Sequence, residues 1–187
     1  EEIENLKEKI LLAIVNINIL EGIRFYVSFA CSFAFGENKI MIGNASILKL
    51  IATDECQHLI LSQYLLKILQ RNEKEGFVEL WNKNKEKIVE MYRVAFEEEK
   101  EWAAYLFKDE SMIGLNEAIL VEYVSHILYT RMAAINLPPI VEERENPIPW
   151  INNWIQYGNV ETLPQENENV SYTIGTLKSD IKIYDIE

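Results

Sequence analysis

The chain has 187 residues, of which 49% are hydrophobic and 26% charged, and its formal net charge is -12. This length suffices for one domain with a sizeable core, and the composition is ordinary for a soluble globular protein. The negative charge, with no basic stripe to offset it, argues against a protein that binds the phosphate backbone of nucleic acids. Cys31 and Cys56 lie in apolar runs, where reduced thiols are expected, and this favours a cytoplasmic location.

The first helical pattern raises the question of a membrane span. The segment 10–35 is strongly apolar, and the N-terminus EEIEN has no basic region typical of a secretory signal. Polar and charged side chains that would be costly in lipid interrupt the segment: Asn16, Asn18, Glu21 and Arg24. We therefore predict a buried core helix here, and no membrane partner.

Four long helical patterns follow one another along the chain, with no strand series and no repeat. The first spans about 3–35 and ends at the polar GENK. The second spans about 45–69, after the start signal Gly43-Asn44. The third follows the polar RNEKEG and runs to about 107, and the fourth spans about 116–135 before the prolines of LPP end it.

Beyond the fourth helix the character of the sequence changes. NPIPWINNW predicts a short irregular segment, and the chain from Gly158 onward is mostly polar without a periodic face. We therefore predict an all-α body over residues 1–157, followed by an extended, flexible C-terminal tail over residues 158–187.

In the second helical pattern, the stretch TDECQHLI places Glu55 three residues before His58, so both side chains share one helix face. Burying a carboxylate on this apolar face is costly unless the group is paired or binds a metal. The Glu-x-x-His spacing is that of di-iron carboxylate sites in helical bundles, where a Glu from a neighbouring helix completes each half. Glu21 in the first pattern is the candidate for that neighbouring ligand.

Simpler interpretations stay open from the residues alone. Glu21 could pair with Arg24 one turn later, and His58 could be a histidine satisfied within the core. His126 has Glu122 four residues before it and no second Glu-x-x-His nearby, so we interpret it as an ordinary helix-surface or core histidine.

The candidate metal site is incomplete by count. A site with four carboxylates and two histidines needs a second Glu-x-x-His and a further carboxylate, and the sequence has neither. Either a partner chain supplies them, or two copies of this chain face each other. Doubling Glu21, Glu55 and His58 gives the required set.

Several long blocks resemble the small, radical-generating subunit of class I ribonucleotide reductase, and they follow the order of that family. They are EGIRFYVSFACSFAF, TDECQHL, EKEWAAYLF, SMIGLN, NPIPWINNW and PQE…SYTIG. The resemblance covers nearly the whole chain and corresponds to the C-terminal half of that subunit. It implies a partial ferritin-like helical bundle, because the family's first ligand helix and its radical-bearing tyrosine have no counterpart here.

The resemblance implies a metal centre shared with residues outside this chain. Glu21 corresponds to the ligand on the EGIRFYVSF helix, and Glu55 and His58 correspond to the ligand pair on the next helix. The expected cofactor is a di-iron centre, although carboxylate-rich sites also accept manganese.

Two further groups of residues have roles implied by the same resemblance. The apolar pocket around the family's tyrosyl radical corresponds to Phe25, Phe29 and Ile51. Radical transfer towards the large subunit corresponds to Asp54 beside the ligands and to Glu166 and Tyr172 in the tail.

The resemblance therefore predicts an oxidoreductase subunit, the C-terminal half of the ribonucleoside-diphosphate reductase small subunit, which serves the reduction of ribonucleotides to deoxyribonucleotides. The expected partners are an N-terminal half, separately encoded or belonging to a longer chain, and the large catalytic subunit, on which the C-terminal tail over 158–187 is expected to dock. The assembled small subunit is expected to be a dimer. Two other functions stay open: a self-sufficient homodimeric di-iron protein, and a catalytically inactive helical module that docks on a large subunit.

Overall fold

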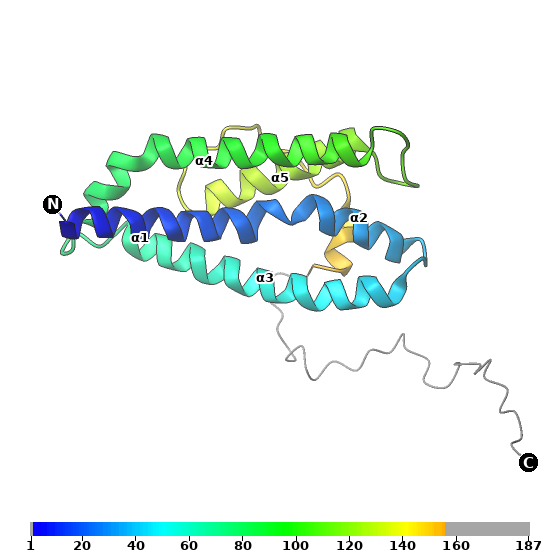
Figure 1. The fold of residues 1–187 in the computed structure, drawn as a ribbon, viewed down its shortest axis with the longest axis horizontal. Coiled ribbons are helices and arrows are strands. Elements are labelled where there is room, and N and C mark those ends of the chain that lie inside the picture. Colours follow the sequence, from blue (N-terminus) through cyan, green and yellow to red (C-terminus); the bar gives the residue numbers. More distant parts are fainter. Residues whose placement is uncertain (1, 156–187) are drawn as a thin grey trace, which may run out of the picture.

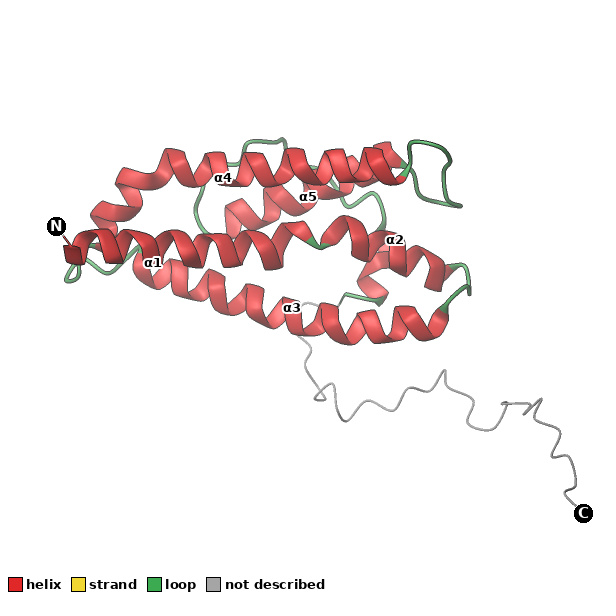
Figure 2. Ribbon diagram, in the orientation of Figure 1, coloured by secondary structure: helices red, strands yellow, loops and turns green. Residues whose placement is uncertain are grey.

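The computed structural model describes residues 2–155, and the described part of the chain is helical apart from its connections (Figures 1 and 2). The helices are α1 (Glu2–Ile19), α2 (Tyr26–Glu37), α3 (Ile42–Leu69), α4 (Phe77–Leu106) and α5 (Glu117–Ala134). A π-helical segment, Leu20–Arg24, lies between α1 and α2, and a short 3-10 helix, Pro149–Asn153, follows α5. The predicted tail over 158–187, with Glu166 and Tyr172, lies outside the described residues.

The helices form an antiparallel bundle, with α1 and α2 at its centre. Figure 1 shows α1 and α2 running nearly end to end through the middle, with α3 running back along one side and α4 and α5 on the other. Helix α1 packs on both α3 and α4, and α4 packs on α5. The all-α body predicted from the sequence is confirmed by this arrangement.

The core lies where α1 and α2 meet the other helices, and helical spacing explains which side chains enter it. On α4 the buried residues recur every three or four positions, so they share one face: Trp81, Asn84, Ile88, Tyr92, Ala95, Glu99 and Ala103. The short connections make α2 and α3, and likewise α4 and α5, antiparallel neighbours in space, whereas α3 and α4 lie on opposite sides of α1.

Two helix boundaries differ from the sequence-based expectation. The first predicted helix is not continuous, because the π-helical segment and Phe25 interrupt it. Helix α3 begins at Ile42 rather than near residue 45, directly after Met41, whose φ of 53° reverses the chain. A left-handed residue such as Met41 is a conformational feature that hydrophobic spacing does not report.

The segment NPIPWINNW closes one end of the bundle. Ile148 and Ile151 are buried, and the Trp154 ring stacks on Phe33 with ring centroids 5.3 Å apart. Its indole Nε1 donates a hydrogen bond of 2.7 Å to Glu37. The short irregular segment predicted here is therefore a 3-10 turn that belongs to the packed body.

Within residues 2–155, the run Glu2–Glu37 is the one helical stretch long and apolar enough to cross a membrane. Core helices of soluble proteins share these properties, so length and composition alone are weak evidence. In the bundle this run is the central element, and it packs against α3, α4 and α5. The run is central but only partly buried, because apolar residues of α1 such as Ile10 and Ile17 are exposed, so the buried core helix predicted here is found only in part.

Candidate metal centre

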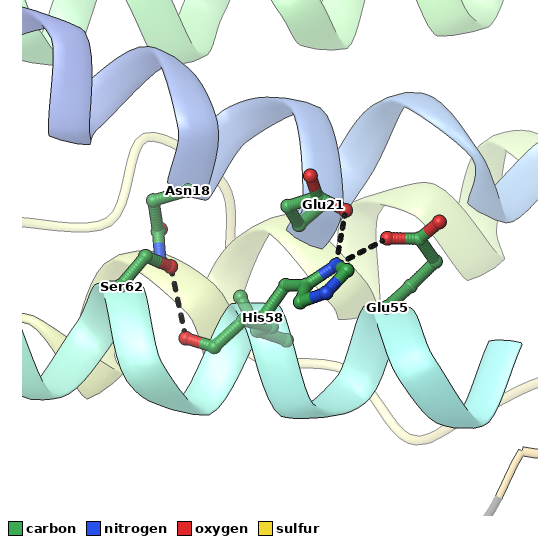
Figure 3. A network of polar contacts seen from close by, with 6 residues as sticks. Asn18, Glu21, Glu55, His58 and Ser62 are labelled. Carbon is green, nitrogen blue, oxygen red and sulfur yellow. Dashed lines mark hydrogen bonds and ion pairs between the residues drawn. The ribbon is translucent and has the colours of Figure 1, made fainter.

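Three predicted ligands meet between the π-helical segment and α3 (Figure 3). Glu21, Glu55 and His58 each offer a ligand atom, and these atoms lie within 4.8 Å of one another. The His58 imidazole lies between the two carboxylates: its Nδ1 is 3.1 Å from Glu55 Oε2 and 3.7 Å from Glu21 Oε2. The structure thus brings together the three residues that the sequence pattern singled out.

Glu21 owes its position to the π-helical segment. A π-turn inserts one residue into the helical ladder and rotates the following side chains around the axis, and such turns occur often at functional sites. Next to Glu21, the π-helical segment and α3 lie so close that a Cβ on Gly22 would approach Leu59 Cδ1 to 2.9 Å. A glycine at this position allows the close approach. The π-turn was not predicted from the sequence. A glycine inside an apolar helical run was its only visible signal.

The two carboxyl groups and the imidazole influence each other's protonation. Burial and then the neighbouring Glu55 carboxyl raise the pKa of Glu21 to about 7. The hydrogen bond with Glu55, with a further contribution from Glu21, raises the pKa of His58 above its ordinary value. Glu21 Oε2 is buried and has no hydrogen-bond partner in the described part of the chain.

The simpler interpretations of these residues are wrong. Arg24 pairs with Glu98 on α4 and not with Glu21. His58 is not a buried core histidine, because its side chain is 56% exposed. His126, by contrast, behaves as the ordinary histidine we predicted, since its Nδ1 hydrogen-bonds to the Arg144 backbone carbonyl at 2.7 Å.

A buried polar chain secures the helices one turn away from the ligands. Tyr92 on α4 donates to Asn18 Oδ1 at 2.5 Å, and Asn18 Nδ2 donates to Ser62 Oγ at 2.8 Å. Ser62 then donates to the Leu59 carbonyl on its own helix, α3 (Figure 3). Because buried polar groups need partners, this series of hydrogen bonds fixes the register of α1 against α3 and α4. The sequence analysis did not identify it.

The residues predicted to surround a radical site and to transfer a radical have mixed environments. Phe25 and Phe29 are in contact, with ring centroids 6.1 Å apart, and Phe29 is buried. Ile51 is 42% exposed on α3, and Asp54 is half-buried next to Glu55. Their roles stay predictions.

The donor set fits a divalent metal ion such as iron or manganese. Two carboxylates and an imidazole are ligands that these metals accept, and Glu21 supplies a buried oxygen without a hydrogen-bond partner. A buried carboxylate in that state is costly unless a cation balances it. The same three groups leave a two-metal site short of ligands, as the sequence count predicts.

An exposed apolar surface adjoins the ligands. On α1, exposed apolar residues recur at alternate spacings of three and four: Ile3, Leu6, Ile10, Ala13, Ile17 and Leu20. On α3 the same spacing includes Asp54 and His58 and the exposed apolar residues Ile47, Ile51, Leu61, Leu65 and Ile68. A groove of about 350 Å³, lined in part by residues of both rows, lies beside Glu21 and His58. We call these two rows and the groove the open face.

The spacing on the open face is the heptad pattern by which helices receive further helices. Monomeric soluble proteins rarely expose contiguous apolar surface on this scale unless it binds something. The ligands therefore lie at a surface suited to additional helices.

Comparisons with known proteins agree on one family. Residues 1–147 match the family described as "Ribonucleotide reductase, small chain". The chain is 46% identical over 186 residues to ribonucleoside-diphosphate reductase subunit beta of Haemophilus influenzae, covering 99% of this chain and 50% of that protein. It is 37% identical over 181 residues to the subunit beta of Enterobacteria phage T4, covering 95% of this chain and 47% of that protein.

The fold agrees with a solved structure. The ribonucleotide reductase R2 subunit from Clostridium botulinum superposes with a TM-score of 0.68 at 32% identity, covering 76% of this chain and 44% of that chain. The predicted ferritin-like, all-α fold is thereby confirmed. The chain spans about half the length of the curated relatives it matches. It belongs to the ribonucleotide reductase small-chain family.

Proposed function

We propose that this chain is the C-terminal half of the small subunit of a ribonucleoside-diphosphate reductase, and that it contributes half of the metal centre. One observation carries the proposal: Glu21, Glu55 and His58 converge from two helices beside an exposed heptad-spaced surface. The order of the sequence blocks supports the assignment to the C-terminal half. The proposed activity is that of an oxidoreductase subunit acting in deoxyribonucleotide synthesis, in the cytoplasm.

In this proposal each ligand has a distinct task. A di-iron centre, or a manganese-containing one, supplies the oxidation chemistry with oxygen that generates a tyrosyl radical. Glu21 and Glu55 bind the metal through carboxylate oxygens, and His58 binds it through an imidazole nitrogen. Nδ1 is the nitrogen that already faces both carboxylates. Phe25 and Phe29 keep water away on the α2 side, together with Ile51 once the open face is covered.

The proposed roles in radical transfer involve three further residues. Asp54 lies next to the ligand Glu55 on α3, where its carboxylate can hydrogen-bond groups brought in by a partner. Glu166 and Tyr172 belong to the segment outside the described residues. A phenol suits a relay because it gives up an electron and a proton together, and Tyr172 is the proposed relay towards the large subunit.

The proposed partner at the open face is the N-terminal half of the small subunit. The missing ligands, a second Glu-x-x-His and another carboxylate, have to come from helices that pack on α1 and α3. The apolar rows on these two helices are spaced for that packing. The assembled small subunit would then act as a dimer with the large catalytic subunit.

The test is reconstitution of the complete centre. The chain is mixed with an N-terminal half taken from a relative, ferrous iron and oxygen are added, and electron paramagnetic resonance is recorded. We expect two irons for each pair of halves and a radical signal. Glu55→Gln should lose iron, while Glu90→Gln, on the exposed side of α4, should not. Absence of both iron uptake and radical in the wild-type mixture would contradict the proposal.

A second candidate follows from the ligand count alone. Two copies of this chain facing each other would provide four carboxylates and two histidines, the set of a complete site. Two irons bound by the isolated wild-type dimer, and lost in Glu55→Gln, would favour this homodimer over the split site. Metal-free association with a large subunit would instead favour a purely structural module.

A further inference from the structure

The break between α1 and α2 exposes backbone groups that need partners. The α2 ladder resumes after the break with Phe29 N–H donating to the Phe25 carbonyl at 2.9 Å. Gly22 C=O and Val27 N–H, five positions apart, span the junction. This is the separation that a π-helical hydrogen bond would join. Both groups receive a side-chain partner from across the bundle, and unpaired backbone groups in a core would be costly.

Arg131 on α5 is the partner of the Gly22 carbonyl. Its Nε donates to Gly22 O at 3.4 Å, and its Nη2 donates to the Tyr26 hydroxyl at 3.1 Å. The guanidinium carbon lies 5.3 Å from the centroid of the Tyr26 ring, within reach of a cation–π contact. A Cβ on Gly22 would lie 3.5 Å from Arg131 Cγ, so the glycine provides room for this approach.

Glu99 on α4 is the partner of the Val27 amide. The Val27 amide lies against its carboxylate at the start of α2, where backbone N–H groups lack partners within the helix, and this contact opposes the rise in the pKa of Glu99 that burial causes. Glu99 is only 6% exposed, and its Oε2 has no hydrogen-bond partner in the described residues. One turn on, Trp102 Nε1 donates to Ser28 Oγ at 3.1 Å, so α4 contacts α2 at two successive turns.

We propose that Arg131 on α5 and Glu99 on α4 are positioning residues, which hold the break open so that Glu21 faces Glu55 and His58. Without them the ladder would close into a continuous helix and turn Glu21 around the axis, away from α3. The inference rests on the proposed function only for Glu21 being a metal ligand. The hydrogen bonds to the backbone are independent of it.

The first test measures hydrogen exchange of the backbone amides in the full chain by mass spectrometry. Arg131→Met and Glu99→Leu each remove one side-chain hydrogen bond to the break. We expect exchange of the segment 20–28 to rise by about tenfold, as for the loss of one buried hydrogen bond. Exchange is measured at pH 5, where Glu99 is protonated in the folded chain, and there Glu99→Gln retains an acceptor for Val27 and should stay close to the wild type. Arg93→Met, which loses only a surface ion pair, is the matched control.

Two outcomes would overturn the proposal. One is unchanged exchange in this segment for Arg131→Met and Glu99→Leu compared with Arg93→Met. The other is equal acceleration in Glu99→Gln and Glu99→Leu, because the acceptor would then be irrelevant. If either apolar variant fails to fold, Glu99→Gln and Arg131→Lys still decide: Gln should leave exchange unchanged, and Lys, with one donor group in place of the fork, should accelerate it partly.

The second test asks whether the break positions Glu21. Cobalt(II) is titrated into the chain mixed with the N-terminal half, and its d–d absorption is followed. We expect the cobalt affinity to fall at least about tenfold in Glu99→Leu and Arg131→Met, and to be retained in Glu99→Gln. Unchanged affinity alongside faster exchange would contradict the positioning role. Absence of cobalt binding in the wild-type mixture would contradict the proposed function, while the exchange results would still test the two backbone contacts.

Discussion

His58 lies between two carboxylates and half in solvent, so its charge depends on Glu21 and Glu55 more than on burial. The Nδ1–Oε2 distances of 3.1 Å to Glu55 and 3.7 Å to Glu21 allow both groups to stabilise the imidazolium. A pKa raised in this way stabilises the folded state below the unfolded pKa of about 6.5, and this stabilisation is lost as the pH rises through the folded pKa. At 56% exposure, solvent screens most of the energy.

We therefore predict that Glu55→Gln lowers the pKa of His58 in the metal-free chain. The hydrogen bond with Glu55 is the largest cause of the raised value, and glutamine has no charge to maintain it. The measurement is a pH titration by NMR of the two histidine ring signals. His126, bonded to the Arg144 carbonyl, provides the second set of ring signals as an internal reference. An unmoved His58 pKa would show that this contact is absent in solution.

Glu99 allows a pH-dependent prediction of stability. Burial raises the pKa of Glu99 to about 7, well above its ordinary value of about 4.5, so the folded chain holds a proton that the unfolded chain releases. This contribution to stability is greatest at low pH and falls as the pH rises from about 4.5 to 7. Glutamine has no charge to bury, so Glu99→Gln should gain stability at pH 8, on the order of 2–3 kcal/mol, and almost none at pH 5.

The measurement is urea unfolding of both proteins at pH 5 and pH 8. Glu90→Gln, on the exposed side of the same helix, should show no such difference between the two pH values. Equal effects of Glu99→Gln at both pH values would mean that Glu99 is ionised throughout or solvated in the folded chain.

The sequence could identify these residues only in part. Helical spacing places Glu55 and His58 on one face, and Glu21 lies on an apolar face of the neighbouring helix, but their roles as ligands were predicted from the family resemblance. The exposure of His58 could not be predicted. The stretch around it is apolar, which normally indicates burial, yet within the described residues nothing packs on this face of α3. The Arg131 and Glu99 contacts join positions far apart in sequence, and no local pattern marks them.

At the scale of the helices, α2 and α3 approach closely at Gly36. A Cβ there would lie 2.7 Å from the Trp154 ring and 2.8 Å from Ala45 Cβ, both of which are packed. Gly43, two residues before Ala45 on α3, has no atom within 4 Å of the equivalent position. Close packing therefore requires a glycine at position 36, whereas position 43 has room for a side chain.

We predict opposite effects for alanine at these two glycines. Gly36→Ala should destabilise the chain by about 1–3 kcal/mol, because overpacking outweighs the gain in helix propensity. Gly43→Ala should stabilise it by up to ~1 kcal/mol, since the helix gains propensity and nothing clashes. Chemical unfolding of the two variants and the wild type gives both values. A stabilising Gly36→Ala would mean that Trp154 does not pack on α2.

The helices themselves were largely predictable, because four long apolar patterns with polar breaks leave few alternatives. The helix boundaries that were predicted wrongly have physical causes that hydrophobic periodicity does not report. Phe25 ends the π-helical segment through a change in hydrogen-bond register, and Met41 starts α3 through a positive φ. The NPIPWINNW segment packs as a 3-10 turn because Trp154 finds a ring and a carboxylate on α2.

At the scale of the molecule, one side of the bundle buries its apolar side chains and the other side leaves them exposed. The side where α4 packs on α1, and α5 on α2 and the π-helical segment, is a continuous core. The open face, in contrast, leaves Ile17 47% and Leu61 57% exposed beside the candidate ligands. Covering such a surface is favourable at roughly 25 cal/mol for each Å² of apolar area. Composition and length gave no sign of this asymmetry, since both suit one closed domain.

We predict that Ile17→Asp and Leu61→Asp leave the chain folded but weaken its association with the N-terminal half at least about tenfold. Both side chains are already exposed in the isolated chain, so little packing is lost within it. A buried, unpaired carboxylate would oppose docking of further helices. Val94→Asp, equally exposed at 45% but on α4, is the matched control and should bind like the wild type. Circular dichroism checks the fold, and sedimentation velocity of the mixtures measures the complex. Equal binding by all three variants would place the partner on another surface of the bundle.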